Sequence, residues 1–564
     1  MKRALLVLLV LAAVAAGFCV RVLPPRPLML ATAASMPPTA RGALHVHSRR
    51  SDGTGTPDGI AAAASRAGLK FVILTDHGDA AREPEPPVYR SGVLLIDAVE
   101  VSTDGGHVVA LGLPKAPYPL GGEARDVLED IRRLGGFAIA AHPGSAKPDL
   151  RWLEWTSPVD GVEWLNGDSE WRDEPRSALA RALFTFPFRP PETLARLLDR
   201  SDTILRRWDA MTARRQVVAV AAGDAHARLG IRSGEPTDNS LALPLPSYES
   251  VFRAMSIAVS PVMLGGDAAA DARVIVDGIR AGHVYSSIDA LAAPAALSFG
   301  AVSGKTQAIA GDILSPTGEV ELRVTTNAPD SARIVLLRHG EPLTSAVGKS
   351  LTYLVSGERA VYRAEIHLPG APGDPPVPWI LSNPVYVGFG KDPPPPTRPP
   401  PSEFATQYDN GLAPDFTVET SPRSVAALDV VGAEAGGTQL SLRWALGGTA
   451  AESPHAALVK PAGPALSGYD RLMFTARADQ PMRLSVQLRV PTAAGGERWH
   501  RSVHIDDTPR QVTIFFDDLT PRGQTTQRRP VLSDVRDLLF VIDTVNTRPG
   551  TSGVIWLDDV KYAR

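Results

Sequence analysis

The first 230 residues contain six histidines, each placed at the boundary of a short apolar segment, and this arrangement most constrains the fold. The segments are apolar on both faces, which is typical of strands buried in a parallel sheet or barrel. Stretches with helical patterns separate them, so we expect an α/β barrel or a doubly wound sheet. The predicted strands are Ala43–His47, Phe71–Asp76, Val93–Val99, His107–Leu111, Phe137–Ala141, Gly161–Leu165 and Val217–Ala222.

Helix signals lie between these strands. Thr56 and Pro57 form a good N-cap and first-turn pair before the alanine-rich Ile60–Ala67. A second helix is expected over Glu123–Leu134, because its apolar side chains share one face. Pro191–Met211 is expected to form a helical excursion before the last strand of this region.

Potential metal ligands stand at the strand ends. In His45-Val46-His47, alternation along the strand places both imidazoles on one side, where they can reach one cation. The strand that ends on Asp76-His77 is unusual, because both buried groups need partners. Side chains at the carboxyl ends of barrel strands converge on one mouth, so distant residues are expected to meet there. Each residue alone also fits a capped turn or a hydrogen-bonded core histidine, but the full set favours a metal site.

These motifs resemble the polymerase and histidinol phosphatase family, called PHP. The resemblance covers roughly residues 42–290 and implies a distorted seven-stranded α/β barrel, a (β/α)7 barrel, with a trinuclear metal centre. The matching segments are His45-x-His47, Ser51-Asp52-Gly53, Thr75-Asp76-His77, Glu100, Gly106-His107, Ala141-His142-Pro143 and Gly223-Asp224-Ala225-His226.

The resemblance implies a metal-ligand set in three groups, with Glu100 bridging the first two. The groups are His45, His47, Glu100 and Asp224; Glu100, His107 and His142; and Asp52, His77 and His226. Asp224, His226 and Glu100 are also expected to be catalytic, and Asp76 is expected to orient ligands from outside the set. The expected cofactors are about two to three divalent ions of manganese, iron or zinc. Asp52 stands where some family members have histidine, which favours manganese, iron or magnesium over zinc in the third group.

The function expected from this set is hydrolysis of phosphate esters by a metal-activated water, as a phosphatase or phosphodiesterase. Arg49, Arg50, Lys147 and Arg228 flank the motifs and are candidate phosphate-binding residues, although solvated surface charge is the alternative for each. A formal net charge of -3 argues against wholesale nucleic-acid binding. The alternatives are a non-catalytic surface or glycan-binding protein on a metal-stabilised barrel, and a 5'-3' exonuclease or nucleoside bisphosphate phosphatase.

The second half of the chain changes to strand patterns. We expect the barrel over 42–292, a small β-sandwich over 293–390 and a proline-rich linker over 391–403. Residues 404–564 are expected to form a jelly-roll-like or galactose-binding-like β-sandwich, a possible carbohydrate-binding-like module that contacts glycan or the cell envelope. Trp444, Trp499 and Trp556 are candidates for stacking on sugars, with burial in the core as the alternative.

The N-terminus carries a targeting pattern. Lys2 and Arg3 precede the uninterrupted apolar run Ala4–Val20, so residues 1–22 are expected to be a signal peptide or a retained membrane anchor. Residues 23–41 are expected to form a proline- and alanine-rich linker. The protein is therefore expected to be exported to the periplasm or another extracytoplasmic space, where any membrane contact would be made through the N-terminal segment.

Overall fold

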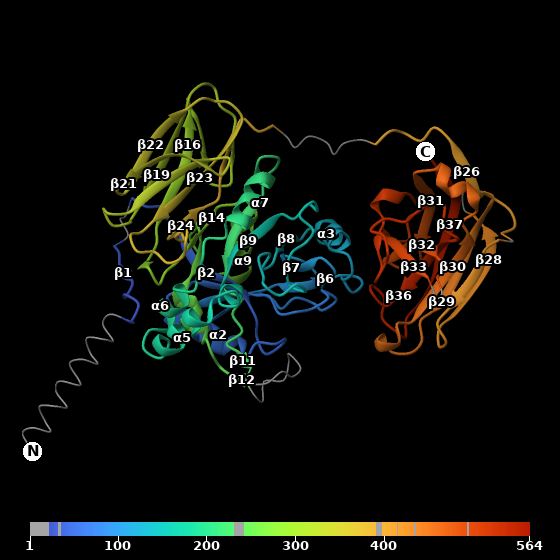
Figure 1. Cartoon of the computed structure of the whole chain (residues 1–564), viewed down its shortest axis with the longest axis horizontal. Helices are drawn as coiled ribbons and strands as arrows, with labels where there is room; N and C mark the ends of the chain where they lie inside the picture. Colours follow the sequence, from blue (N-terminus) through green and yellow to red (C-terminus); the bar gives the residue numbers. More distant parts are fainter. Residues whose placement is uncertain are drawn as a thin grey trace, which may run out of the picture. The chain divides into compact units, whose positions relative to one another are not determined.

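The computed structural model describes residues 22–31, 35–230, 242–390, 398–413, 415–433, 436–492 and 496–564. The predicted targeting run Ala4–Val20 and the prolines Pro393–Pro396 lie outside the described residues. The chain divides into two compact units (Figure 1). Unit 1 comprises Met1–Pro114 and Ile131–Pro393, and unit 2 comprises Lys115–Asp130 and Pro394–Arg564. No helix in the described part of the chain has both the length and the apolar character needed to cross a membrane.

Two sheets of unit 1 supply the strands that end near the histidines. A five-stranded sheet has the order β10-β9-β8-β7-β6, and a twelve-stranded mixed sheet contains the run β14-β13-β2-β3-β5-β4. The strands of the first sheet are β6 (Val99–Thr103), β7 (Gly106–Leu111), β8 (Phe137–Ala140), β9 (Gly161–Asn166) and β10 (Val218–Ala222). Those of the run in the second are β2 (Ala40–Val46), β3 (Phe71–Leu74), β4 (Val88–Arg90), β5 (Val93–Asp97), β13 (Ser256–Val259) and β14 (Val284–Ser287).

The two sheets are bridged at both edges of the smaller one. Isolated parallel bridges join Val46 to Ala225, after β10, and His77 to Glu100, on β6. Parallel pairing is present in β2–β3–β5 and in β8–β9–β10, but β7 runs antiparallel to both of its neighbours. The predicted alternation of strands and helices is present in this region, whereas a closed seven-stranded barrel stays a prediction.

Across the described residues the protein is mostly β-sheet, with eight α-helices. The predicted cap of the first helix is present, since the Thr56 side chain accepts a hydrogen bond from the Gly59 N–H at 3.0 Å. The helical excursion predicted before the last strand is divided into several shorter helices. The eight are α2 (Pro57–Arg66), α3 (Ala124–Arg133), α4 (Gly167–Glu170), α5 (Arg176–Thr185), α6 (Pro190–Ala195), α7 (Asp202–Thr212), α8 (Tyr248–Ala254) and α9 (Ala268–Arg280).

A β-sandwich in unit 1 shares its second sheet with the α/β region. One layer is the sheet β17-β16-β19-β22, and the other continues the twelve-stranded sheet through the antiparallel pairing of β24 with β14. Because of this shared sheet, the region predicted as a separate small sandwich packs as one body with the strands before it. Its strands are β16 (Leu297–Ser303), β17 (Thr306–Ile309), β18 (Ile313–Leu314), β19 (Val320–Thr326), β20 (Arg333–Arg338), β21 (Glu341–Val347), β22 (Ser350–Val355), β23 (Ala360–His367), β24 (Ile380–Ser382) and β25 (Val385–Val387).

Unit 2 is built on two six-stranded sheets with a shared apolar core. The all-β character predicted for the C-terminal region is confirmed. The segment Lys115–Asp130 also belongs to this unit, although it lies between β7 and β8 in the sequence. Within the unit, the buried Arg483 donates to Asp130 at 2.7 Å and to the backbone carbonyl of Asp126 at 2.9 Å. The longest strands are β28 (Val425–Gly432), β29 (Thr438–Ala445), β31 (Arg471–Ala478), β32 (Met482–Val490), β33 (Glu497–Ile505) and β37 (Ser552–Ala563).

Candidate metal centre

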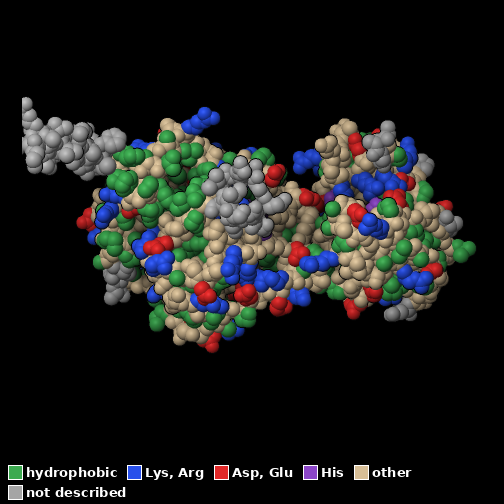
Figure 2. Space-filling view, turned by 90° about the horizontal axis from the view of Figure 1, so that it is seen from below, with side chains coloured by type: hydrophobic (Ala, Val, Ile, Leu, Met, Phe, Trp, Pro, Cys, Tyr) green, Lys and Arg blue, Asp and Glu red, His purple; other side chains and the backbone are tan. Residues whose placement is uncertain are grey.

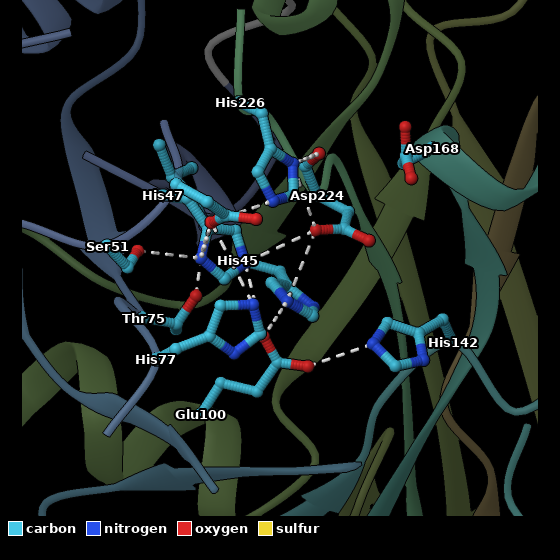
Figure 3. A network of polar contacts seen from close by, with 12 residues as sticks. His45, His47, Ser51, Thr75, His77, Glu100, His142, Asp168, Asp224 and His226 are labelled. Carbon is cyan, nitrogen blue, oxygen red and sulfur yellow. Dashed lines mark hydrogen bonds and ion pairs between the residues drawn. The ribbon is translucent and has the colours of Figure 1, made fainter. Parts of the chain in front are cut away.

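Strand ends of unit 1 bring the nine predicted ligands into one place. They come from β2, β6 and β7 and from the turns that follow β2, β3, β8 and β10. Figure 3 shows imidazole rings and carboxylates from these elements directed toward one another. We call these residues the histidine–carboxylate cluster: His45, His47, Asp52, His77, Glu100, His107, His142, Asp224 and His226.

The cluster contains four overlapping groups in which the potential ligand atoms all lie within 4.8 Å of one another. Two residues, His45 and His47, each belong to two groups, and so do His77 and Glu100. Such overlap is the arrangement expected of neighbouring cations that share ligands. The groups are His47, Asp52, His77 and His226; His45, His47 and Asp224; His45, Glu100 and His142; and His77, Glu100 and His107.

Glu100 lies at the centre of the cluster and is almost fully buried. Its Oε1 atom lies 2.8 Å from a ring nitrogen of His107 and 2.8 Å from one of His142. Its Oε2 atom lies 3.1 Å from His45 Nε2 and 3.2 Å from His47 Nε2. The same Oε2 atom lies 3.3 Å from His77 Nδ1, so the two oxygens of one carboxylate face different sets of histidines.

The donor set fits divalent cations. The Nε2 atom of His47 is buried without a hydrogen-bond partner among the described residues, which is costly unless a cation or water binds it. Imidazole and carboxylate donors suit manganese, iron and zinc. His47 Nε2 also lies 3.3 Å from Asp224 Oδ1, so a nitrogen lone pair and a carboxylate oxygen face the same small space.

Hydrogen bonds on the far side of the rings orient three histidines. The Nδ1 atom of His142 lies 3.0 Å from the carbonyl oxygen of Leu150, and that of His226 lies 2.9 Å from the carbonyl oxygen of Asp224. A carbonyl only accepts, so each Nδ1 carries a proton and leaves Nε2 as the free electron pair. The Nδ1 atom of His45 faces the carboxylate of Glu163 in the same way, at 2.5 Å. In these three histidines the tautomer leaves Nε2 available to a metal ion.

The backbone is strained at three members of the cluster. His45, His142 and Asp224 have φ values of 63°, 30° and 47°, in a region that favours glycine. Each such conformation costs on the order of 1–3 kcal/mol and persists only where the surrounding structure enforces it. These positive φ values occur at or just after the ends of β2, β8 and β10, where the three side chains enter the cluster.

Burial and charge act against each other on the titratable groups of the cluster. Burial opposes the charged form of His45, yet Asp224, Glu163 and Glu100 together raise its pKa well above the ordinary value. Burial also opposes ionisation of Glu100, but His45 and hydrogen bonds from neighbouring histidines hold its pKa well below the usual range. The carboxylates thus favour a positive charge at the centre, which a divalent cation supplies as well as protons do.

The same opposition holds in the group around Asp52. Despite burial, the hydrogen bond and charge of His226 lower the pKa of Asp52 to about 2. In return Asp52 and Asp224 outweigh burial and raise the pKa of His226 to about 9. At His77 burial is the larger effect and lowers the pKa. Asp52 is therefore an ionised oxygen donor at neutral pH.

One buried carboxylate that the sequence analysis did not single out, Glu163, supports two ligands. Its Oε1 atom lies 2.5 Å from His45 Nδ1, and its Oε2 atom accepts the backbone N–H of His142 at 2.6 Å. The Asn166 side chain donates to the same Oε2 at 2.8 Å. Glu163 therefore fixes the ring of one ligand and the strained backbone of another. The available signal was an acidic residue inside the predicted buried strand Gly161–Leu165.

Asp76 organises the loop after β2. Its two oxygens accept from the backbone N–H of Ser48 at 2.7 Å and from the hydroxyls of Ser48 and Ser51 at 2.8 Å. It does not belong to any of the four ligand groups found among the described residues. This placement agrees with a role in orienting the loop that carries His47 and Asp52.

The candidate phosphate-binding residues differ in their surroundings. Arg50 is engaged by three carboxylates, since it lies 3.1 Å from Asp76, 2.9 Å from Glu85 and 3.0 Å from Asp97. The charge of Arg50 is therefore shared with carboxylates, and phosphate binding by Arg50 stays a prediction. Arg49 and Lys147 are exposed, and the half-buried Arg228 lines a cavity beside the cluster.

The candidate sugar-stacking tryptophans of unit 2 are mostly in its core. Trp444 and Trp499 are only 3% and 2% exposed and pack in the apolar core, so their rings are not available to a glycan. Trp556 is half-buried, and the guanidinium of Arg477 lies 3.9 Å from its ring centroid. Of the two alternatives for Trp444 and Trp499, the structure therefore shows burial in the core.

Comparison with known proteins adds two relatives in sequence. Over 122 residues the chain is 31% identical to a 3',5'-nucleoside bisphosphate phosphatase of Chromobacterium violaceum, covering 20% of this chain and 43% of that protein. The chain thus spans about two fifths of the length of this relative. Over 139 residues it is 29% identical to an uncharacterised protein of Methanocaldococcus jannaschii, covering 22% of this chain and 80% of that one. No family model matches the chain.

Solved structures of carbohydrate-binding modules also align with part of the chain. The family 11 module of the cellulosomal cellulase Lic26A-Cel5E of Clostridium thermocellum aligns with a TM-score of 0.24 at 14% identity, covering 28% of this chain and 92% of the module. A family 30 module from a cellulase of the same organism aligns with a TM-score of 0.22 at 12% identity, covering 28% of this chain and 97% of that module.

Proposed function

We propose that the protein is a metal-dependent hydrolase of phosphate esters. The observation that carries this proposal is the histidine–carboxylate cluster, in which four ligand groups overlap through shared residues. Divalent cations in such an arrangement polarise phosphate oxygens and lower the pKa of water, which is the chemistry that ester hydrolysis requires. The similarity of a short stretch to a named phosphatase supports the same reaction class.

Each part of the cluster has a task in this proposal. Glu100 would supply carboxylate oxygens to two of the ligand groups. Asp52, His77 and His226 would hold a further cation, with the ionised Asp52 as the oxygen donor. Asp224 reaches both the cluster and the neighbouring cavity, where it meets the substrate beside His226. Glu163 keeps the ring of His45 in the ligating orientation.

A nucleoside bisphosphate is the second candidate substrate, because the named relative acts on one. Binding to nucleic acid strands is not favoured. Basic and acidic side chains are interspersed on the face shown in Figure 2, in keeping with the net charge of -3. A strand-binding surface would instead need a continuous basic groove. We include a 5'-3' exonuclease as an outcome of the test below.

The test combines metal analysis with turnover. Protein purified without chelators is analysed for bound metal and assayed with p-nitrophenyl phosphate, bis-p-nitrophenyl phosphate, adenosine 3',5'-bisphosphate and a short oligonucleotide. We expect about two to three equivalents of metal and turnover that is lost on chelation and restored by manganese, iron or zinc. Absence of both metal and turnover after metal addition would overturn the proposal.

Replacement of the central carboxylate sharpens this test. Glu100→Gln removes one negative charge from two ligand groups while keeping the shape of the side chain. We expect turnover to fall by more than about 100-fold, beyond the loss typical of residues that only support ligands. Glu341→Gln, on an exposed strand of the same unit, is the matched control and should retain metal and activity. Intact turnover in Glu100→Gln would refute the proposed site.

We further propose that this activity is located outside the cytoplasm. The support is the basic start and apolar run of residues 1–22 in the sequence. Fractionation of cells that express the full chain, with phosphoesterase activity measured in the periplasmic, membrane and cytoplasmic fractions, tests this location. Activity confined to the cytoplasm would contradict it.

Contact of unit 2 with glycan also stays a prediction, testable by retention of the protein on cell-envelope polysaccharide.

A further inference from the structure

A cavity of about 320 Å³ adjoins the histidine–carboxylate cluster within unit 1. We call it the α5 cavity, because α5 forms one wall. Asp224 and His226 line one part of it, so the cavity reaches the residues that hold the reacting group. Most of the other lining side chains are apolar, including Leu179, Leu183, Phe186, Leu197, Leu245 and Met255. The size matches that of sites which enclose most of a small organic molecule, about 300–1,000 Å³.

The walls suit an apolar leaving group better than a nucleoside. A base and a ribose carry several hydrogen-bonding groups, and burying them against leucine and phenylalanine side chains leaves those groups unpaired. An alkyl chain has no hydrogen bonds to lose in the same place, and its transfer out of water is favourable. The charged and histidine side chains that line the cavity come from two segments: Asp168 and Glu170 lie on α4, and Asp224, His226 and Arg228 follow β10. A ligand with one charged end and one apolar end therefore matches the cavity.

The wall of the cavity also presents apolar side chains to solvent. Leu183, Phe184 and Phe188 are 78%, 44% and 62% exposed, and all lie on α5 or just after it. Leu183 contributes both to this exposed group and to the cavity lining. Large apolar side chains gathered beside a binding cavity are typical of a site that takes its ligand from an apolar phase or aggregate.

The N-terminal segment meets the same helices. Arg181 donates to the carbonyl oxygen of Val22 at 3.5 Å, and Arg189 donates to that of Pro24. In the sequence, the apolar run Ala4–Val20 ends two residues before Val22. If that run is held in a membrane, α5 and the exposed apolar side chains are tied close to the membrane surface.

We infer that the α5 cavity holds the apolar chain of an amphiphilic phosphate ester, whose phosphate lies at the cluster between Asp224 and Glu100. This inference rests on the proposed phosphoesterase function and specifies its substrate class. Water adds to phosphorus, the P–O bond to the chain breaks, and the alcohol leaves with one proton from the water. The products are a long-chain alcohol and inorganic phosphate.

Chain length is the first variable to test. The full chain, loaded with the metal that supports turnover, is assayed with butyl, hexyl, octyl and decyl phosphate at concentrations where each is monomeric. Burial of each methylene strengthens binding up to roughly fourfold, so we expect kcat/KM to rise at least about tenfold from butyl to decyl phosphate. A flat or falling series, with p-nitrophenyl phosphate still hydrolysed, overturns this inference alone. No hydrolysis of any ester overturns the phosphoesterase function itself.

Filling the cavity gives a structural counterpart. Ala182 is half-buried on α5 and lines the cavity, whereas Ala180 is exposed on the same helix and is absent from the lining. Ala182→Trp should lower the ratio of kcat/KM for decyl over butyl phosphate at least about fivefold, because the indole occupies the space of several methylenes. Ala180→Trp is the matched control and should leave the ratio unchanged. An unchanged ratio in Ala182→Trp would count against the inference.

The source of the chain is tested separately. Phosphatidic acid embedded in phosphatidylcholine vesicles is compared with monomeric decyl phosphate, using free phosphate release as the readout. Turnover of both supports a membrane lipid as the substrate, and turnover of the monomer alone supports a soluble amphiphile. Failure on both, with butyl phosphate hydrolysed, refutes the assignment of the cavity to an apolar chain.

Discussion

Glu163 is the residue on which the orientation of two ligands depends, since it contacts the His45 ring and the His142 backbone at once. It lies on β9, and its partners lie on β2, in the other sheet, and after β8, so strands of both sheets must be in place before it can act. Buried carboxylates of this kind fix the tautomer and ring plane of a ligating histidine and increase its basicity.

We expect Glu163→Gln to weaken metal binding without unfolding the protein. Glutamine still accepts the His142 N–H but lacks the negative charge that stabilises a proton on His45 Nδ1. Loss of such an outer partner typically weakens metal affinity about 10- to 100-fold. Competition with a chelator of known affinity measures the change. Glu249→Gln, in an exposed ion pair with Arg66, is the control and should bind metal as the wild type does. Equal affinity in Glu163→Gln would show that the carboxylate is structural only.

The cluster could be anticipated from the sequence because its members end apolar segments, and the structure brings all nine together. Two features of the site could not be anticipated from the sequence. The partners of Arg50 come from three separate segments, so its engagement by Asp76, Glu85 and Asp97 is invisible without the fold. The strained φ angles of His45 and Asp224 also carry no pattern, because they arise from contacts that the rest of the chain imposes.

At the scale of elements, β10 is held by a side chain as well as by its sheet. The Asn383 amide, after β24, donates to the carbonyl oxygens of Ala219 and Val284 at 2.9 and 2.8 Å and accepts the Ala219 N–H at 2.8 Å. Since β10 leads directly to Asp224, this amide links the sandwich of unit 1 to the position of a predicted ligand.

Asn383→Leu should therefore destabilise unit 1. The leucine fits a buried position but leaves one N–H and two carbonyls without their partner, at a cost of about 3 kcal/mol in the free energy of unfolding. Chemical denaturation followed by tryptophan fluorescence measures this change. Gln307→Leu, at an exposed position on β17, should stay within about 0.5 kcal/mol of the wild type. A similar small change in Asn383→Leu would mean that water replaces the lost bonds.

Helix α4 introduces a pH dependence. Burial, with the charges of Asp173, Asp199 and Glu174 nearby, raises the pKa of Glu170 to about 8 from an ordinary value near 4.5. The folded state thus binds more protons than the unfolded state between these values, and stability falls as pH rises from about 4.5 to 8. Glu170→Gln should flatten this decline in thermal unfolding scans across pH. A parallel decline in both proteins would assign it to another group.

The sequence pattern predicted α2 together with its N-cap, but it did not predict where the helices before β10 begin and end. Thr56 and Pro57 give a local signal that needs no tertiary contact. The stretch predicted as one helical excursion forms α6 and α7, and α5 precedes it without a side-chain cap. The antiparallel direction of β7 could not be predicted from the sequence either, because the direction of pairing depends on the neighbouring strands and not on the periodicity of the segment.

At the scale of the whole molecule, the two units are not two successive halves of the chain. Unit 2 takes Lys115–Asp130 from the first part of the sequence and combines it with the C-terminal sandwich. Proline content indicated a boundary near residue 391, but the earlier segment looked like part of the α/β region. Its membership depends on buried charge pairs between residues hundreds of positions apart, for which a single sequence carries no signal.

Arg483→Met tests the importance of these pairs. The Arg483 side chain is 1% exposed, and its Nε and Nη1 atoms lie 2.7 Å from Asp130 and 3.6 Å from Asp126. Removing Arg483 leaves the buried Asp130 without a cation, whereas Asp126 keeps Arg501, and breaking a buried pair in this way costs about 3–5 kcal/mol. We expect a lower thermal transition for unit 2 while the metal content of unit 1 is kept. Arg477→Met, over the half-buried Trp556, is the control. An unchanged transition in Arg483→Met would show that water compensates Asp130.

The separation of 353 residues between Asp130 and Arg483 has a consequence for biosynthesis. A ribosome that adds roughly 5–20 residues per second needs roughly 20 to 70 seconds to travel from one to the other. Within this interval the remaining strands around the histidines, β8 to β10, are made, while Asp126 and Asp130 wait in water without Arg483. The segment between β7 and β8 is therefore among the last parts of the early sequence to reach its folded environment. In a polypeptide released before Arg483 is made, Asp130 of this segment has no arginine to pair with.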